Sequence, residues 1–158
     1  MIKDEVNMYP YNKPSRQYQA ADAPKTDEIF LDLLIEAMTD EATDMQYYEK
    51  LSWMVSDAED REVVRHVQAD EKKHLKALTD IYQMLTGEVP TVTAREFEIG
   101  NDLHAEFDKR VLAELNGMEF YRNLYLSHKS TELRDIFFEI LTDELEHAVK
   151  MQYLRGRN

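Results

Sequence analysis

Apolar residues recur every three or four positions along four long stretches of the chain, the spacing typical of amphipathic helices. This pattern predicts helices over about 26–55, 56–86, 102–127 and 132–154. The chain has only four glycines and four prolines, so little interrupts these stretches. Four long helices in one chain predict an all-α protein with a four-helix bundle.

Local sequence signals mark several of the predicted helix ends. Ser56 and Glu59 form a capping box at the start of the second helix, and Gly87 stands at the C′ position after its end. Thr93 and Glu96 form another capping box, which leaves room for a short helix before the third long one.

The lengths of the links predict how the helices are paired. The first and second helices, and the third and fourth, are joined by short links, so each pair is expected to form an antiparallel hairpin. The link over 87–101 is too long for a hairpin. Because an extended chain covers about 3.3 Å per residue, this link could run the length of a bundle. The sequence therefore predicts two helical hairpins joined by a long crossover.

The N-terminal segment, 1–25, differs from the rest of the chain. It contains three of the four prolines and shows no helical periodicity. We interpret 1–25 as an extended N-terminal arm, with a disordered tail as the alternative. Residues 26–158 are expected to form a single bundle domain with its own core.

Glutamate and histidine interrupt the apolar seams of the second and fourth helices. Glu71 and His74 lie on the seam of the second helix, and Glu144 and His147 lie on that of the fourth. Glu144 and His147 lie the same number of positions after Glu71 and His74, respectively. In each pair the Glu and His are three positions apart, which places them side by side on one helix face.

The first and third helices follow the same repeat. The offset that relates Glu71 to Glu144 also relates Glu41 to Glu114 and Tyr48 to Tyr121. These two glutamates and two tyrosines also lie on apolar seams. The chain is therefore predicted to be a duplicated helical hairpin.

Packing the four seams together would bury four carboxylates and two imidazoles in one core. Desolvation costs several kcal/mol per buried charge, and neighbouring carboxylates raise one another's pKa. Two divalent cations would neutralise four carboxylates, with the imidazoles completing the coordination. The alternative for each histidine alone is a core imidazole paired with a glutamate of its own helix. The predicted metal ligands are Glu41, Glu71, His74, Glu114, Glu144 and His147.

Composition excludes several classes of function. The chain has no cysteine, which excludes disulfides, thiolate metal sites and cysteine nucleophiles. The net charge of −13 argues against nucleic-acid partners and anionic membrane surfaces. Neither a membrane-spanning apolar stretch nor a signal peptide is visible, so a cytoplasmic location is expected.

The repeated pattern of Glu-x6-Tyr followed by Glu-x2-His resembles the ferritin-like superfamily of di-iron carboxylate proteins, and most of all its rubrerythrin branch. The resemblance covers residues 27–155 and implies a ferritin-like bundle with two iron ions; manganese or zinc would suit similar ligands. By this resemblance Glu71 and Glu144 bridge the ions. The resemblance gives each ion one further carboxylate and one imidazole, from Glu41 with His74 and from Glu114 with His147.

The same resemblance assigns supporting roles. Tyr48 and Tyr121 resemble the hydroxyls that bond ligand carboxylates, and together with Glu71 and Glu144 they are the residues expected to act in catalysis. Asp70 and Asp143 are candidates to accept from the histidine rings. The chain departs from rubrerythrins in two ways. It lacks the cysteine-ligated rubredoxin domain, and Gly117 stands where the family has a further carboxylate.

The function implied is an oxidoreductase that reduces hydrogen peroxide or dioxygen with electrons from an external donor, or a ferroxidase if ferrous iron is the donor. An iron-binding or storage protein and a di-manganese catalase are the alternatives, with a purely structural bundle as a further one. A homodimer is the expected assembly.

Overall fold

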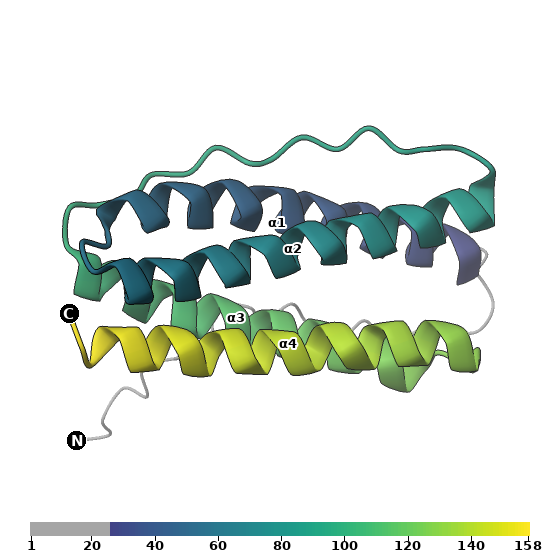
Figure 1. The fold of residues 1–158 in the computed structure, drawn as a ribbon. Helices are drawn as coiled ribbons and strands as arrows, with labels where there is room; N and C mark the ends of the chain where they lie inside the picture. The colour runs from purple at the N-terminus through teal and green to yellow at the C-terminus, as the bar shows by residue number, and fades with distance from the viewer. Residues whose placement is uncertain (1–25) are drawn as a thin grey trace, which may run out of the picture.

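Four long helices make up most of the part of the chain that the computed structural model describes, residues 26–158. They are α1 (Thr26–Met54), α2 (Ala58–Thr86), α3 (Leu103–Ser127) and α4 (Thr131–Arg155). α1 packs on α2 and α3 packs on α4, as two hairpins lying along one another (Figure 1). The predicted all-α four-helix bundle of two hairpins is confirmed. The predicted N-terminal arm lies outside the described residues.

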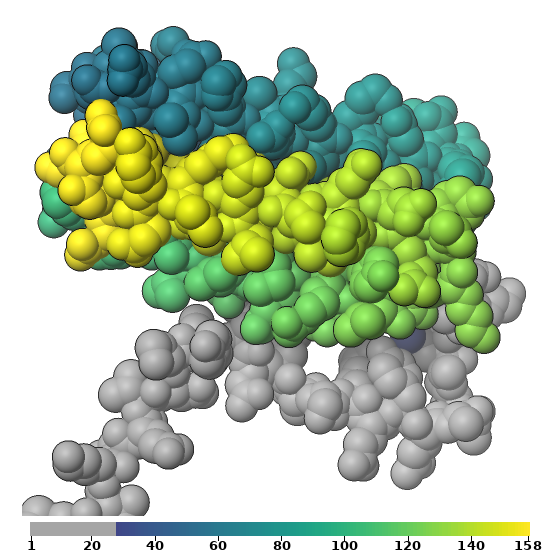
Figure 2. All heavy atoms as spheres, turned by 60° about the horizontal axis from the view of Figure 1, so that its bottom comes forward, coloured from purple at the N-terminus to yellow at the C-terminus, as the bar shows by residue number. Residues whose placement is uncertain are grey.

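The helices of the two hairpins that approach most closely are α2 and α4, which lie side by side (Figure 2). Side chains also join α1 to α3, as between Asp44 and Arg110. Among the described helices, none has an apolar stretch long enough to cross a membrane.

The ends of α2 are fixed by one cap that the sequence predicted and one that it did not. Gly87 is confirmed as the C-terminal cap, with φ of 77° and its N–H donating to the Gln83 carbonyl at 2.8 Å. The N-cap is Asp57 and not Ser56, so the predicted capping box is wrong. The Asp57 carboxylate accepts from the backbone N–H groups of Glu59 and Asp60, both at 2.9 Å. Asp57 replaces Ser56 as the N-cap because its negative charge also interacts favourably with the helix dipole.

Gly87→Ala is expected to lower the free energy of unfolding by about 1 kcal/mol, because an L-residue is strained in the left-handed region. A Cβ at Gly87 would meet nothing within 4 Å, so the effect would come from the backbone alone. Chemical denaturation would measure it. Gly156→Ala is the matched control, since Gly156 ends α4 with φ of −78° and tolerates a side chain. Equal effects of the two substitutions would contradict this account.

The crossover from 88 to 102 runs along the outside of α1, from the end of α2 to the start of α3 (Figure 1). This described segment contains no helix, so the capping box of Thr93 and Glu96 does not start one. Tertiary contacts hold the segment extended instead. The backbone N–H of Arg95 donates to Thr43 Oγ1 in α1 at 2.9 Å, a bond that a local helix would not provide.

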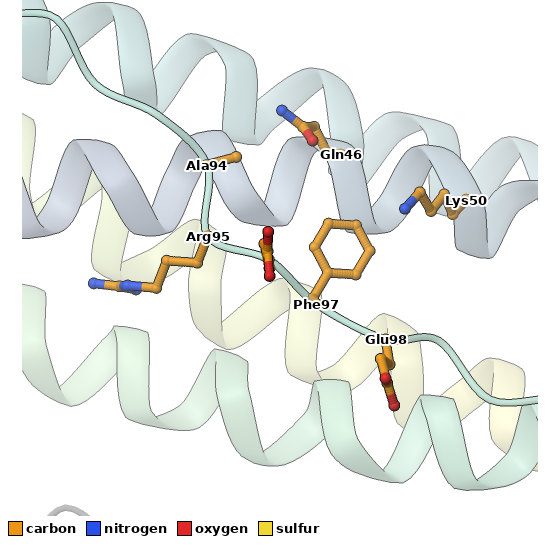
Figure 3. Close-up of a pocket in the computed structure, with 7 residues that line it drawn as sticks. Gln46, Lys50, Ala94, Arg95, Phe97 and Glu98 are labelled. Carbon is orange, nitrogen blue, oxygen red and sulfur yellow. The ribbon is translucent and has the colours of Figure 1, made fainter.

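Side chains add to this attachment. The Phe97 ring packs against Tyr47 of α1 with ring centroids 5.3 Å apart. The Lys50 ammonium lies 4.2 Å from the centroid of the Phe97 ring (Figure 3). Arg95 also forms an ion pair with Asp40. The crossover therefore covers one side of α1.

The buried apolar residues form two clusters. On α4, Phe137 and Ile140 belong to one cluster and Met151 and Leu154 to the other. The same division holds on α2, where Leu78 belongs to the first cluster and Val64 to the second. The polar seam residues of both helices lie between these clusters, so the bundle has an apolar layer on each side of a polar centre.

Candidate metal centre

Six acidic and imidazole side chains converge at the polar centre. α1 and α3 each contribute one glutamate, while α2 and α4 each contribute a glutamate and a histidine one turn later. None of the six residues is more than 4% exposed. They are Glu41, Glu71, His74, Glu114, Glu144 and His147.

The six residues form two overlapping groups, each capable of holding a metal ion. One group contains Glu41, Glu71, His74 and Glu144, and the other contains Glu71, Glu114, Glu144 and His147. Within each group the candidate ligand atoms all lie within 4.8 Å of one another. Glu71 and Glu144 belong to both groups, which is the position that a bridging carboxylate needs. The ligand roles themselves stay a prediction.

The His74 ring is oriented by contacts on both of its nitrogens. Nδ1 faces the cluster, 3.2 Å from Glu71 Oε2, 3.3 Å from Glu144 Oε1 and 3.5 Å from Glu41 Oε2. Nε2 lies 3.2 Å from Asp143 Oδ2 in α4. A proton on Nε2, donated to Asp143, would leave the Nδ1 lone pair for a metal ion.

His147 has the corresponding arrangement in the other half. Its Nδ1 lies 3.1 Å from Glu71 Oε1 and 3.5 Å from Glu114 Oε2, and its Nε2 lies 3.5 Å from Asp70 Oδ2. Each aspartate thus faces the histidine of the opposite hairpin. The sequence suggested Asp70 and Asp143 as acceptors for the rings but could not say which aspartate would face which ring.

Each of the two seam tyrosines also bonds to a glutamate of the opposite hairpin. The Tyr48 hydroxyl of α1 donates to Glu114 Oε1 of α3, and the Tyr121 hydroxyl of α3 donates to Glu41 Oε1 of α1. Burial raises the pKa of both hydroxyls, which keeps them protonated as donors. Each hydroxyl therefore holds one oxygen of a candidate ligand, while the other oxygen lies toward the centre.

Several buried polar atoms of the centre have no hydrogen-bond partner among residues 26–158. They are Glu71 Oε1, Glu114 Oε2, Glu144 Oε1 and both ring nitrogens of His147. Some of these atoms lie close together, but the angles between them do not suit a hydrogen bond. Unpaired buried polar atoms are rare in folded proteins and call for a partner such as an ion. The donor set of carboxylates and imidazoles fits a pair of divalent cations.

Without cations, protons must offset the buried charge. Burial raises the pKa of Glu41 to about 8, and burial beside Glu71 and Glu114 raises that of Glu144 well above its usual range. Burial alone would lower the pKa of His147, but its contacts with Glu114 and Glu71 outweigh this and raise it to about 10. These protons occupy the same lone pairs that metal ions would need.

Sequence reasoning missed one buried arginine at the centre. Arg110 is only 6% exposed. Its guanidinium donates to Glu114 Oε1, to Asp44 Oδ1 at 2.7 Å and to the Tyr48 hydroxyl at 3.1 Å. Burial opposes ionisation of Glu114, but the Arg110 charge outweighs this and holds the pKa of Glu114 far below its usual range. The available signal was the spacing, since Arg110 lies four residues before Glu114 on the same helix face.

A pocket of about 550 Å³ between α1 and α3 reaches the centre. Glu41, Tyr121 and Glu144 line it together with Gly117. A Cβ at Gly117 would lie 3.2 Å from Glu144 Oε2, so the glycine leaves room beside this carboxylate. A second pocket, of about 630 Å³, lies beneath the crossover and is lined by none of the six candidate ligands (Figure 3).

Comparison with known proteins supports the fold but names no activity. No family model matches the chain. The uncharacterized protein YhjR of Bacillus subtilis is 24% identical over 147 residues, covering 92% of this chain and 93% of YhjR. A hypothetical protein of Pyrococcus furiosus has a solved structure with a TM-score of 0.70 and 23% identity, covering 84% of this chain and 92% of that one. The latter likeness shows a shared fold.

Proposed function

We propose that this protein is a rubrerythrin-like di-iron oxidoreductase that reduces hydrogen peroxide or dioxygen with electrons from an external donor. The observation that carries the proposal is the pair of four-residue groups sharing Glu71 and Glu144 between two apolar layers. A structural bundle would gain nothing from four carboxylates in this position.

Charge balance supports two ions and not one. Four carboxylates carry four negative charges, which two divalent cations would neutralise, with neutral imidazoles as further ligands. In the proposed assignment Glu71 and Glu144 bridge, Glu41 and His74 complete one position, and Glu114 and His147 complete the other. Oxygen and imidazole ligands also suit manganese or zinc, so the ligand set does not fix the metal.

The residues around the centre support a redox role over iron storage. The apolar clusters on both sides limit the access of water, while the pocket at Gly117 gives a small oxidant a route to Glu41 and Glu144. Tyr121 holds Glu41 through one oxygen. A bound ferrous pair would supply two electrons that, with two protons, convert hydrogen peroxide to two water molecules.

The electron donor in this proposal lies outside the four-helix bundle. The chain has no cysteine with which to hold a rubredoxin-type iron. Electrons would therefore reach the centre from a partner protein or a small reductant, or from ferrous iron itself if the protein acts as a ferroxidase.

Elemental analysis and anaerobic peroxide titration test the proposal. Protein reconstituted with ferrous iron is expected to hold about two iron ions per chain and to be oxidised by hydrogen peroxide faster than iron in buffer. Glu146→Gln is a matched control, because Glu146 is exposed on the same helix as Glu144 and pairs with Lys150. A folded protein that binds no metal would overturn the proposal.

The alternatives give different results in the same experiment. Oxygen release from peroxide by manganese-loaded protein, without a reductant, would identify a di-manganese catalase. Accumulation of far more than two iron ions per chain in a large particle would identify a storage protein.

A further inference from the structure

The two halves of the proposed metal centre match in their ligands but differ beside them. Under the constant offset that relates Glu41 to Glu114, Arg110 corresponds to Ala37 and Asp44 corresponds to Gly117. The second half therefore has a charged pair where the first half has two of the smallest residues.

In the second half, the charged pair closes the surroundings of Glu114. Arg110 contacts Glu114, Asp44 and the Tyr48 hydroxyl at once, so the carboxylate is held by two donors. The Glu114 and His147 side chains are both 0% exposed. Neither Glu114 nor His147 lines the pocket that reaches the centre.

In the first half, the pocket of about 550 Å³ reaches the candidate ligand Glu41, with Ala37 and Gly117 in its lining. Arg110 and Asp44 line the same pocket, but the ligands Glu114 and His147 behind them do not. The Glu41 and His74 side chains are each 5% exposed. Glu41 accepts from the Tyr121 hydroxyl, the counterpart of Tyr48, but it has no counterpart of the Arg110 donor. Fewer donors from neighbouring side chains therefore hold Glu41 than hold Glu114.

We propose that the Glu41–His74 position is the open, exchangeable metal position and that Arg110, held by Asp44, is a positioning residue that closes the Glu114–His147 position. This inference rests on the proposed metal centre. It assigns entry of ions and of small oxidants to the pocket side of the bundle and makes the second ion a fixed partner.

Cobalt exchange tests the inference without an activity assay. Metal-free protein is loaded with Co²⁺, and the loss of its visible absorption is followed after addition of excess EDTA. Wild-type protein is expected to release one ion per chain rapidly and the other at least about tenfold more slowly, the scale of effects from residues that support ligands. His74→Gln should remove the fast phase, and His147→Gln should remove the slow one.

Substitution of Arg110 tests its role directly. Arg110→Ala introduces the residue of the other half and is expected to bring the slow phase close to the fast one. Arg122→Ala, at an exposed position on the same helix that pairs with Glu119, should leave both phases unchanged. If Arg110→Ala does not fold, Arg110→Lys serves instead, because it retains the charge but cannot make all three contacts; it too should accelerate the slow phase.

The outcomes separate the two proposals. Folded wild-type protein that binds no Co²⁺ would overturn the metal centre itself. Two ions released in a single phase would overturn the inequivalence alone. Two phases that persist unchanged in a folded Arg110 variant would overturn the role of Arg110.

Discussion

Glu71→Ala is expected to bind neither metal ion, whereas wild-type protein binds about two per chain. The Glu71 carboxylate belongs to both candidate groups, with Oε2 lying 3.2 Å from His74 Nδ1 and Oε1 lying 3.1 Å from His147 Nδ1. Removing it takes one ligand from each position and leaves three carboxylates opposite two divalent cations. Metal analysis after anaerobic reconstitution and desalting measures the effect. Glu144→Ala is expected to behave in the same way.

Two controls make this result specific to bridging. Glu41→Ala removes a ligand from one position only, so it should retain about one ion per chain. Glu62→Ala should retain both ions, because Glu62 is an exposed residue on the same helix as Glu71, pairing with Arg65 and His66. A folded Glu71→Ala protein that keeps a full pair of ions would show that the assignment of bridging carboxylates is wrong.

The helices and the convergence of the candidate ligands could be predicted because both depend on spacing within one helix. Glu71 and His74 lie three residues apart on a seam whose other members are apolar, so folding the seam inward carries them with it. The internal repeat then places a second pair, Glu144 and His147, at the same level of the bundle.

Contacts between helices could not be read in the same way. The repeat leaves open whether Tyr48 meets the glutamate of its own half or that of the other half, and the structure has the crossed arrangement with Glu114. Arg110 was missed because an arginine near an apolar seam is ordinarily solvent-exposed. Its burial depends on Asp44, a residue 66 positions away in sequence. The extended crossover similarly depends on the tertiary contact between Arg95 and Thr43.

The metal-free protein is expected to lose stability as the pH rises from about 6 to 9, with a fall in Tm of roughly 5 °C or more. Burial raises the pKa of Glu41 from 4.5 to about 8, so the folded state holds a proton that the unfolded chain releases. This contribution is complete below pH 4.5 and disappears as the pH passes 8. Thermal unfolding of chelator-treated protein at a series of pH values measures the effect.

His147 acts in the same direction over an overlapping range. Its contacts with Glu114 and Glu71 outweigh burial and raise its pKa from 6.5 to about 10, so its contribution is complete below pH 6.5 and is lost as the pH passes 10. Glu114 has a lowered pKa, and its contribution is lost only as the pH falls below 4.5.

Divalent cations would replace the protons on Glu41 and His147, and their binding strengthens as these groups deprotonate. Metal should therefore raise Tm more at pH 9 than at pH 6. A metal-free Tm that rises between these values would show that the six side chains do not share one buried centre.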